Sequence, residues 1–364
     1  MEYPTEFPTF EIVEPLQTIP TLGSTVAQKS VIMLGGRIVN AFVKSGVTPV
    51  AVEKIRNQST SQEALNLIGT KGKPSFRAPD VYGLNPNGDL ATEWIDTEPL
   101  SEVKDVQYTG RVLGRILATF DKYAERSISP PQFGLRETHD AYVTSLRERI
   151  WNRLDLGHIN KGEAALYCRS IERLNAAYES LASVVQHGDL RPDHIYPDPT
   201  DKCGYVIIDS ELMRGIWPRF YDLGKSLARY AITHPNPTLG TAVLQEFLAA
   251  SGADPEVVLL SLKGILAARA LAFGLFPIHD LRPVSRRMAA NFRKRSNVLL
   301  ESLSTVNDMQ HLVWLINATA NRTDLESEIA DTAYHFSERL TLRMLDSVRP
   351  GYQRFRESEP CNVL

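Results

Sequence analysis

Two aspartates near the middle of the chain have the spacing of a phosphoryl-transfer site. Asp189 follows an apolar pair at 184–185, and Asp209 ends an apolar run at 205–208. Each aspartate therefore follows a predicted buried strand. A carboxylate at Asp189 can accept a hydrogen bond from a hydroxyl group, and one at Asp209 can bind a divalent cation held by phosphates. The pair is typical of chemistry that moves a phosphate group to an acceptor oxygen.

The residues around Asp189 resemble the catalytic loop of kinase-like phosphotransferases. Segment 187–194 reads H-G-D-L-R-P-D-H, and the aminoglycoside phosphotransferase family carries H-G-D-L-H-P-x-N or a close variant. The resemblance extends more weakly over about residues 24 to 300. It implies that Asp189 is the catalytic aspartate and that His187 packs beneath the loop and fixes its backbone. Arg191 would meet the γ-phosphate or, alternatively, be solvated or paired with Asp193.

Two positions depart from the family pattern. His194 stands where the family has an Asn that binds a second Mg²⁺, and we interpret it as a metal-site or water-bridging residue that suits Mn²⁺ better than Mg²⁺. Asp209 resembles the metal-binding aspartate of the D-F-G position, but Ser210 replaces the usual aromatic residue. Glu211 would supply a further carboxylate or, as the simpler alternative, face solvent. These departures keep open a rival hypothesis, a nucleotide-binding pseudokinase or scaffold with little or no turnover.

A lysine in the N-terminal part of the chain is predicted to bind phosphates. Lys54 continues an apolar alternation over 49–55, which predicts a strand, and it resembles the V-A-I-K lysine of kinases. Glu63, at the start of a helix predicted over 61–68, would hold Lys54 through an ion pair. A lysine on a strand is otherwise usually a solvated edge residue.

Two further segments are predicted to contact the nucleotide. Gly35 and Gly36 form a turn between predicted strands, where backbone amides can approach phosphates. The segment at 92–95 resembles the family's hinge, in which the backbone of Glu93 and Ile95 would hydrogen-bond adenine. Further along the chain, the Y-D-L sequence at Asp222 resembles a family motif whose aspartate supports the catalytic loop.

The order of predicted elements indicates an α+β class, a two-lobed protein-kinase-like fold. A small antiparallel β-sheet with one helix is followed by a large, mainly helical lobe. The helical spacing continues into the tail, where a helix is predicted over 324–349. We expect four parts: an N-terminal arm (1–22), a nucleotide-binding N-lobe (23–97), a helical C-lobe with the catalytic loop (98–305) and a C-terminal helical extension (306–364).

The composition excludes several classes of partner. The 364 residues are 43% hydrophobic and carry a formal net charge of −3, which gives no electrostatic attraction to nucleic acid or to anionic membranes. The basic stretch 282–295 is interpreted as a solvated helix face. The three cysteines, Cys168, Cys203 and Cys361, are far apart, as expected in a reducing compartment. The N-terminus lacks a signal-peptide pattern, so we expect a cytoplasmic protein.

Together these features predict that the γ-phosphate of MgATP moves to a hydroxyl of a small molecule. GTP in place of ATP and Mn²⁺ in place of Mg²⁺ remain alternatives. The acceptor can be an aminoglycoside- or macrolide-like antibiotic, an amino alcohol or a sugar. Four acidic residues would attract a cationic acceptor or would simply be solvated: Asp121, Glu125, Glu137 and Asp140.

Overall fold

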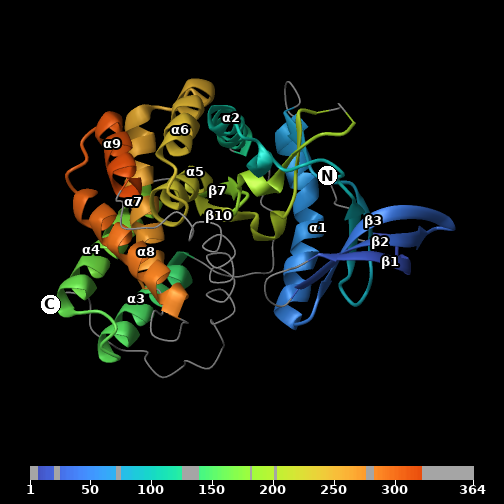
Figure 1. Ribbon diagram of the computed structural model, residues 1–364, viewed down its shortest axis with the longest axis horizontal. Coiled ribbons are helices and arrows are strands. Elements are labelled where there is room, and N and C mark those ends of the chain that lie inside the picture. The colour runs from blue at the N-terminus through green and yellow to red at the C-terminus, as the bar shows by residue number, and fades with distance from the viewer. Residues whose placement is uncertain are drawn as a thin grey trace. The chain divides into compact units, whose positions relative to one another are not determined.

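The computed structural model describes residues 7–19, 25–70, 75–124, 139–180, 183–200, 203–275 and 283–321. The chain divides into two compact units, each described here by itself. The first unit combines Met1–Asp105, Ile116–Arg136 and Val184–Gly215, and the second combines Val106–Arg115, Glu137–Ser183 and Ile216–Leu364. Asp189 and Asp209 therefore belong to the unit that holds the N-terminal sheet, whose strands β1, β2 and β3 are labelled in Figure 1.

The first unit contains the expected antiparallel sheet, with strand order β1-β2-β3-β6-β5. Its strands are β1 (Glu11–Ile19), β2 (Thr25–Leu34), β3 (Arg37–Gly46), β5 (Val81–Leu84) and β6 (Leu90–Glu93). One face buries a core that includes Phe10, Ile32, Ala41 and Val43. Because side chains alternate along a strand, Phe42 and Lys44 of β3 face the opposite side.

The strand predicted over 49–55 is wrong, because this segment is the beginning of helix α1 (Pro49–Thr70). Thr48 starts the helix: its Oγ1 accepts a hydrogen bond from the Ala51 N–H (3.3 Å), and its carbonyl accepts one from the Val52 N–H (3.0 Å). Pro49 suits the first helical position because its ring fixes φ and no N–H is needed there. The helix predicted over 61–68 is the second half of α1, which lies against the sheet (Figure 1).

A second sheet positions Asp209, the predicted metal-binding aspartate. Strand β4 (Phe76–Arg77) pairs in parallel with β9 (Tyr205–Ile207), and β9 pairs antiparallel with β8 (Ile195–Pro197). Strand β7 (Ser183–Gln186), which precedes Asp189, pairs with β10 (Arg214–Pro218). Asp189 and Asp209 thus both follow buried strands, as predicted.

The second unit is mainly helical, as predicted. Its helices are α3 (His139–Asp155), α4 (Lys161–Ser180), α5 (Tyr221–Ala228), α6 (Pro237–Ser251), α7 (Pro255–Gly274), α8 (Pro283–Ser302) and α9 (Met309–Ala320), while α2 (Val106–Ala124) begins in this unit and ends in the first. Helix α7 packs against α4, α8 and α5. It is long and apolar enough to cross a membrane, yet 67% of the relevant window is buried, as in the core helix of a globular unit. The helix predicted over 324–349 lies outside the described residues.

The basic stretch of α8 is not a solvated face at the two arginines whose contacts are described. Arg293 donates to the carbonyl oxygens of Gly274 (3.0 Å) and His158 (2.8 Å). Arg295 is buried and donates to the carbonyl oxygen of Ile232. These side chains satisfy backbone carbonyls of the unit, which is a structural role.

Candidate active site

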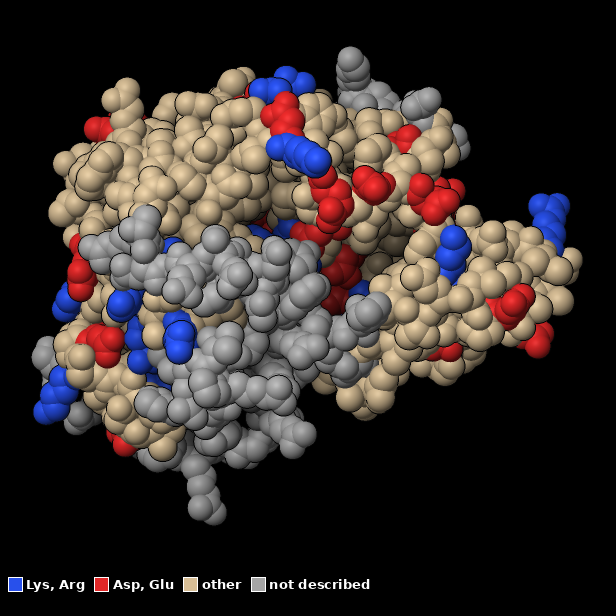
Figure 2. All heavy atoms as spheres, viewed as in Figure 1, with Lys and Arg blue, Asp and Glu red and all other residues tan. Residues whose placement is uncertain are grey.

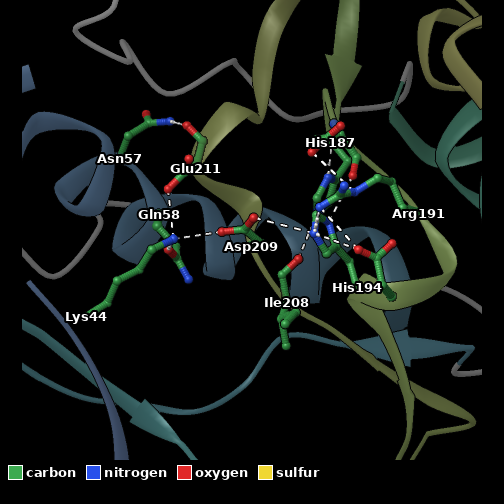
Figure 3. A network of polar contacts seen from close by, with 11 residues as sticks. Lys44, Asn57, Gln58, His187, Arg191, His194, Ile208, Asp209 and Glu211 are labelled. Carbon is green, nitrogen blue, oxygen red and sulfur yellow. Dashed lines mark hydrogen bonds and ion pairs between the residues drawn. The ribbon is translucent and has the colours of Figure 1, made fainter. Parts of the chain in front are cut away.

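A buried lysine on β3 joins the sheet to the segment after β9 (Figure 3). Lys44 Nζ donates to Asp209 Oδ1 (2.7 Å), Glu211 Oε2 (2.8 Å) and Gln58 Oε1 (3.2 Å). These three acceptors match the three donor hydrogens of an ammonium group. Burial alone would lower the pKa of Lys44, but the two carboxylates outweigh it and hold that pKa above its ordinary value.

Asp209 shows the reciprocal effect. Burial would raise the pKa of its carboxyl, but Lys44 and His194 outweigh burial and hold this pKa well below its usual range. The residue has a left-handed backbone with φ of 63°, uncommon for a non-glycine residue. It leads into a short 3₁₀ turn, Ser210–Leu212, in which Ser210 and Glu211 are both buried. The expectation that Glu211 faces solvent is therefore wrong.

Lys54 and Glu63 do not form the predicted pair. Both lie on α1, roughly two and a half turns apart, so they point to opposite faces and are separated by roughly 13 Å along the axis. The lysine that contacts Asp209 is Lys44. The sequence does contain a signal for this arrangement, because Thr48 followed by Pro49 is typical of the start of a helix. If a helix begins there, Lys44 is the lysine near the end of the preceding strand.

Gly35 and Gly36 form the predicted turn between two strands, with φ of 56° and 81°. The pairing of Leu34 with Arg37 places this turn at the far end of β3, roughly 23 Å from Lys44. The turn therefore cannot cover phosphates held at Lys44. Ala27, at the other end of β2, is the residue that pairs with Lys44. The β1–β2 connection at 20–24 lies outside the described residues.

His187 lies buried beneath the catalytic loop. Its Nε2 donates to the carbonyl oxygen of Ile208 (3.1 Å), its Nδ1 lies 3.4 Å from the Asp189 nitrogen, and its ring meets Phe120 edge-on. Burial, assisted by the nearby His194, lowers the pKa of His187 to about 4. Its imidazole is therefore neutral near pH 7. Gly188, with φ of 83°, must be small because a Cβ there would lie 2.5 Å from the Leu212 oxygen.

His194 directs one ring nitrogen toward Asp209. Its Nδ1 donates to the carbonyl oxygen of Asp189 (3.0 Å), which assigns the proton to Nδ1 and leaves Nε2 as an acceptor. Arg191 donates to Nε2, which also lies 3.6 Å from Asp209 Oδ2. Arg191 is buried and ion-paired with Asp193 (3.3 Å) and with Asp189 (3.4 Å). The pairing with Asp193 was one of the two alternatives expected for this arginine.

The pair of Asp209 and His194 fits a small divalent cation once Arg191 releases His194 Nε2, because that nitrogen has a single lone pair. With metal–ligand distances of about 2.1 Å, two donors 3.6 Å apart can bind one ion. Lys44 Nζ donates to Oδ1 of Asp209. The other carboxylate oxygen, Oδ2, is the one that lies 3.6 Å from His194 Nε2. Within the described residues no group of three or more His, Cys, Asp or Glu side chains could hold a metal. Two protein ligands suit a cation whose remaining ligands are phosphate oxygens and water.

The predicted hinge is tied to a buried ion network. The Glu93 N–H donates to the Asp80 carbonyl (2.8 Å), so hydrogen bonding to adenine by this residue rests on its carbonyl oxygen. Its carboxylate pairs with both terminal nitrogens of Arg77, which also makes two hydrogen bonds to Asp198. Hydrogen bonds to Arg77 and to two backbone N–H groups outweigh burial and hold the pKa of Asp198 far below its usual range. Ile95 is half-buried in the non-helical segment after β6.

The remaining predicted residues are Asp222 and the four acidic residues named as candidates for attracting a cationic acceptor. Asp222 is buried in the first turn of α5, in the second unit, and its support of the catalytic loop stays a prediction. Asp121 is buried, so it does not contribute to an exposed acidic surface of the kind predicted to attract a cationic acceptor. Glu125 and Glu137 lie outside the described residues, as does the side chain of Asp140.

Comparison with known proteins yields matches only among solved structures, since no family model and no curated protein matches the chain. Plasmodium vivax ethanolamine kinase aligns over 81% of this chain and 83% of its own, with a TM-score of 0.51 and 14% sequence identity. The chain has the kinase-like fold. A microcompartment-associated aminopropanol kinase (16% identity, 82% and 93% coverage, TM-score 0.49) and a Cryptosporidium parvum choline kinase (13%, 86% and 91%, 0.48) are also similar.

The kinase-like fold allows the residues of this cluster to be compared with those of kinases by their positions in the fold. Kinases use a lysine on the third strand of the N-terminal sheet, a catalytic-loop aspartate and a metal-binding aspartate. In this chain Lys44 lies on β3, and Asp189 and Asp209 follow β7 and β9. The predicted fold class is confirmed, and Lys44 rather than Lys54 contacts Asp209.

Proposed function

We propose that this protein is an ATP-dependent phosphotransferase that moves the γ-phosphate to a hydroxyl of a small molecule. The observation that carries the proposal is the Lys44–Asp209 ion pair at 2.7 Å, with His194 Nε2 3.6 Å from the same carboxylate. These side chains come from β3, from the turn before β8 and from the end of β9.

The chemistry follows from the groups present. The acceptor oxygen attacks the γ-phosphorus, the bond between that phosphorus and the β,γ-bridging oxygen breaks, and ADP leaves with that electron pair. Asp189 accepts the hydroxyl proton and orients the oxygen. Lys44 would bind phosphate oxygens in exchange for one of its three present acceptors. Arg191, two residues from Asp189, would reach the transferred group by exchanging one of its carboxylate contacts. The nucleotide can be ATP or GTP.

Asp209 and His194 would hold the divalent cation. When bound, that ion neutralises phosphate charge during the transfer. Because His194 offers an imidazole nitrogen rather than an amide oxygen, the site suits Mn²⁺ as well as Mg²⁺.

An amino alcohol is our first choice of acceptor. The segment after β6 exposes four carboxylates, Asp96, Glu98, Glu102 and Asp105, within ten residues of the sequence. Figure 2 shows some acidic side chains grouped on the drawn face and others scattered over it. Such a surface attracts cations and raises their local concentration. The similarity of fold to an ethanolamine kinase supports the same choice.

A mass-shift screen tests the proposal. The protein would be incubated with ATP or GTP, with Mg²⁺ or Mn²⁺, and with ethanolamine, choline, aminopropanol, an aminoglycoside, a macrolide or a sugar. We expect an increase in acceptor mass of one phosphate group that disappears in the Asp209→Asn variant. Nucleotide binding without transfer to any acceptor would instead favour the pseudokinase hypothesis, which rests on His194 and Ser210.

A further inference from the structure

The lysine of this site has an unusual set of partners. In protein kinases the strand lysine pairs with a glutamate of the helix that follows the strand. Here α1 follows β3, and its contact with Lys44 is Gln58, whose amide oxygen lies 3.2 Å from Nζ. An amide accepts a hydrogen bond but brings no charge. The helix therefore contributes no carboxylate to Lys44.

Glu211 supplies the charge that the helix lacks. Its Oε2 lies 2.8 Å from Lys44 Nζ, and both side chains are about 10% exposed. With Asp209 at 2.7 Å, the buried ammonium has two carboxylates and one amide as partners. Charge-assisted hydrogen bonds of this kind are roughly twice as strong as neutral ones.

The backbone around Glu211 is fixed by the same helix. Asn57, the residue before Gln58, donates from Nδ2 to the carbonyl oxygen of Glu211 (2.7 Å). The Met213 N–H closes the turn onto Ser210 (3.0 Å). Two consecutive residues of α1 thus hold the lysine and the turn that carries its second carboxylate.

We infer that Glu211 is a positioning residue that replaces the helix glutamate of kinases and leaves Asp209 Oδ2 to face the cation site. This inference rests on the proposed function. Without Glu211, Asp209 is the one carboxylate that remains on Lys44 among the described residues, and it must serve the lysine and the cation together. The charge that positions Lys44 thereby comes from Glu211, two residues beyond Asp209, rather than from α1, which contributes the neutral amide of Gln58.

A charge-relocation experiment tests the inference. Glu211→Gln keeps the shape and removes the charge, and we expect MgADP binding, measured calorimetrically, to weaken about tenfold or more. The double variant Gln58→Glu/Glu211→Gln returns one carboxylate to Lys44 from the helix side, and we expect it to recover most of the lost affinity and kcat. Glu53→Gln, the same change on the exposed face of α1, is the control and should bind as the wild type does.

Two outcomes overturn the inference: wild-type affinity in Glu211→Gln, or a double variant that stays as weak as the single one while its Tm matches the wild type. Tm measurements on single and double variants distinguish these two outcomes from a failure of the proposed function. If the wild type binds no nucleotide, the proposed function fails, and the Tm values of Lys44→Met, Glu211→Gln and their combination still report the pairing. Additive Tm losses would show that the two residues do not act together.

Discussion

Lys44 of β3 donates to Asp209 across a distance of 2.7 Å, although 165 residues separate them in the sequence. This contact joins the antiparallel sheet to the strand that positions the metal-binding aspartate. It also decides which of two neighbouring lysines belongs to the site.

Replacing Lys44 should therefore affect the nucleotide, and replacing Lys54 should not. We expect Lys44→Met to weaken MgADP binding on the order of ten- to a hundredfold, the scale of a lost charge-assisted hydrogen bond. Lys54→Met, measured well below its Tm, should keep the wild-type dissociation constant. The reverse ranking in a calorimetric titration would return the phosphate-binding role to Lys54.

Replacing Asp189 should slow the transfer without releasing the nucleotide. We expect Asp189→Ala to lower kcat on the order of a hundred- to ten-thousandfold, the contribution of a positioned general base. Asp193→Ala is the matched control, because it removes the other carboxylate that pairs with Arg191. Equal rates for Asp189→Ala and the wild type, in a coupled ADP-release assay, would contradict the assignment.

Changing His194 should alter the preferred metal. An amide oxygen is a harder ligand than an imidazole nitrogen, so His194→Asn should shift activity from Mn²⁺ toward Mg²⁺. We expect a change in the ratio of the two metal affinities on the order of tenfold, which is the scale for altered metal-site residues. Titrating each metal into EDTA-treated protein with ADP measures the ratio, and an unchanged ratio would remove His194 from the cation site.

The Arg77 network should be the strongest electrostatic contribution to stability in the first unit. Arg77→Met leaves Asp198, whose side chain is fully buried, with a charge and no cation, so we expect a loss of about 3–5 kcal/mol in the free energy of unfolding. Arg115→Met is the control, because Arg115 is 68% exposed and its pair with Glu246 should contribute less than about 1 kcal/mol. Urea denaturation of the two variants compares them directly.

Stability should fall in acid because of His187. Its pKa is about 4 in the folded protein and near 6.5 in the unfolded chain, so between these values the unfolded state binds the proton first. The folded state therefore loses stability as the pH falls from about 6.5 to 4, in total on the order of 3 kcal/mol. His187→Gln keeps a donor for Ile208 and does not titrate, so its Tm deficit relative to the wild type should shrink from pH 7.5 to pH 5. A constant deficit would contradict the low pKa.

The position of the segment 187–194 after a buried strand could be predicted because the information is local, while its catalytic role stays a prediction. Asp189, His187 and their neighbours occupy one short segment, and a buried strand precedes it. The phosphate-binding lysine could not be predicted in the same way, because the apolar residues at 47–55 fit a strand and a helix about equally well. When this segment is interpreted as a strand, Lys54 is the predicted lysine, whereas the observed helix makes it Lys44.

Other features depend on contacts between distant segments. The sequence favours a solvated Glu211, because charged side chains rarely lie buried without a partner. Its partner, Lys44, is 167 residues away in the sequence. The joining of Arg77 to Glu93 and Asp198 is equally non-local. The glycine pair at 35–36 marked a real turn, but only the strand register shows that this turn lies at the far end of β3 from Lys44.

The parallel pairing of β4 with β9 has a consequence for synthesis of the chain. Roughly 130 residues separate the two strands, which at about 5–20 residues per second is a delay on the order of ten seconds at the ribosome. During that interval β4 has no partner, and Lys44 lacks both of its carboxylates. A fragment that stops at residue 97 would keep β4 and Lys44 without these partners permanently. Chaperone binding or aggregation would therefore matter most while the N-terminal sheet has been synthesised and β9 has not.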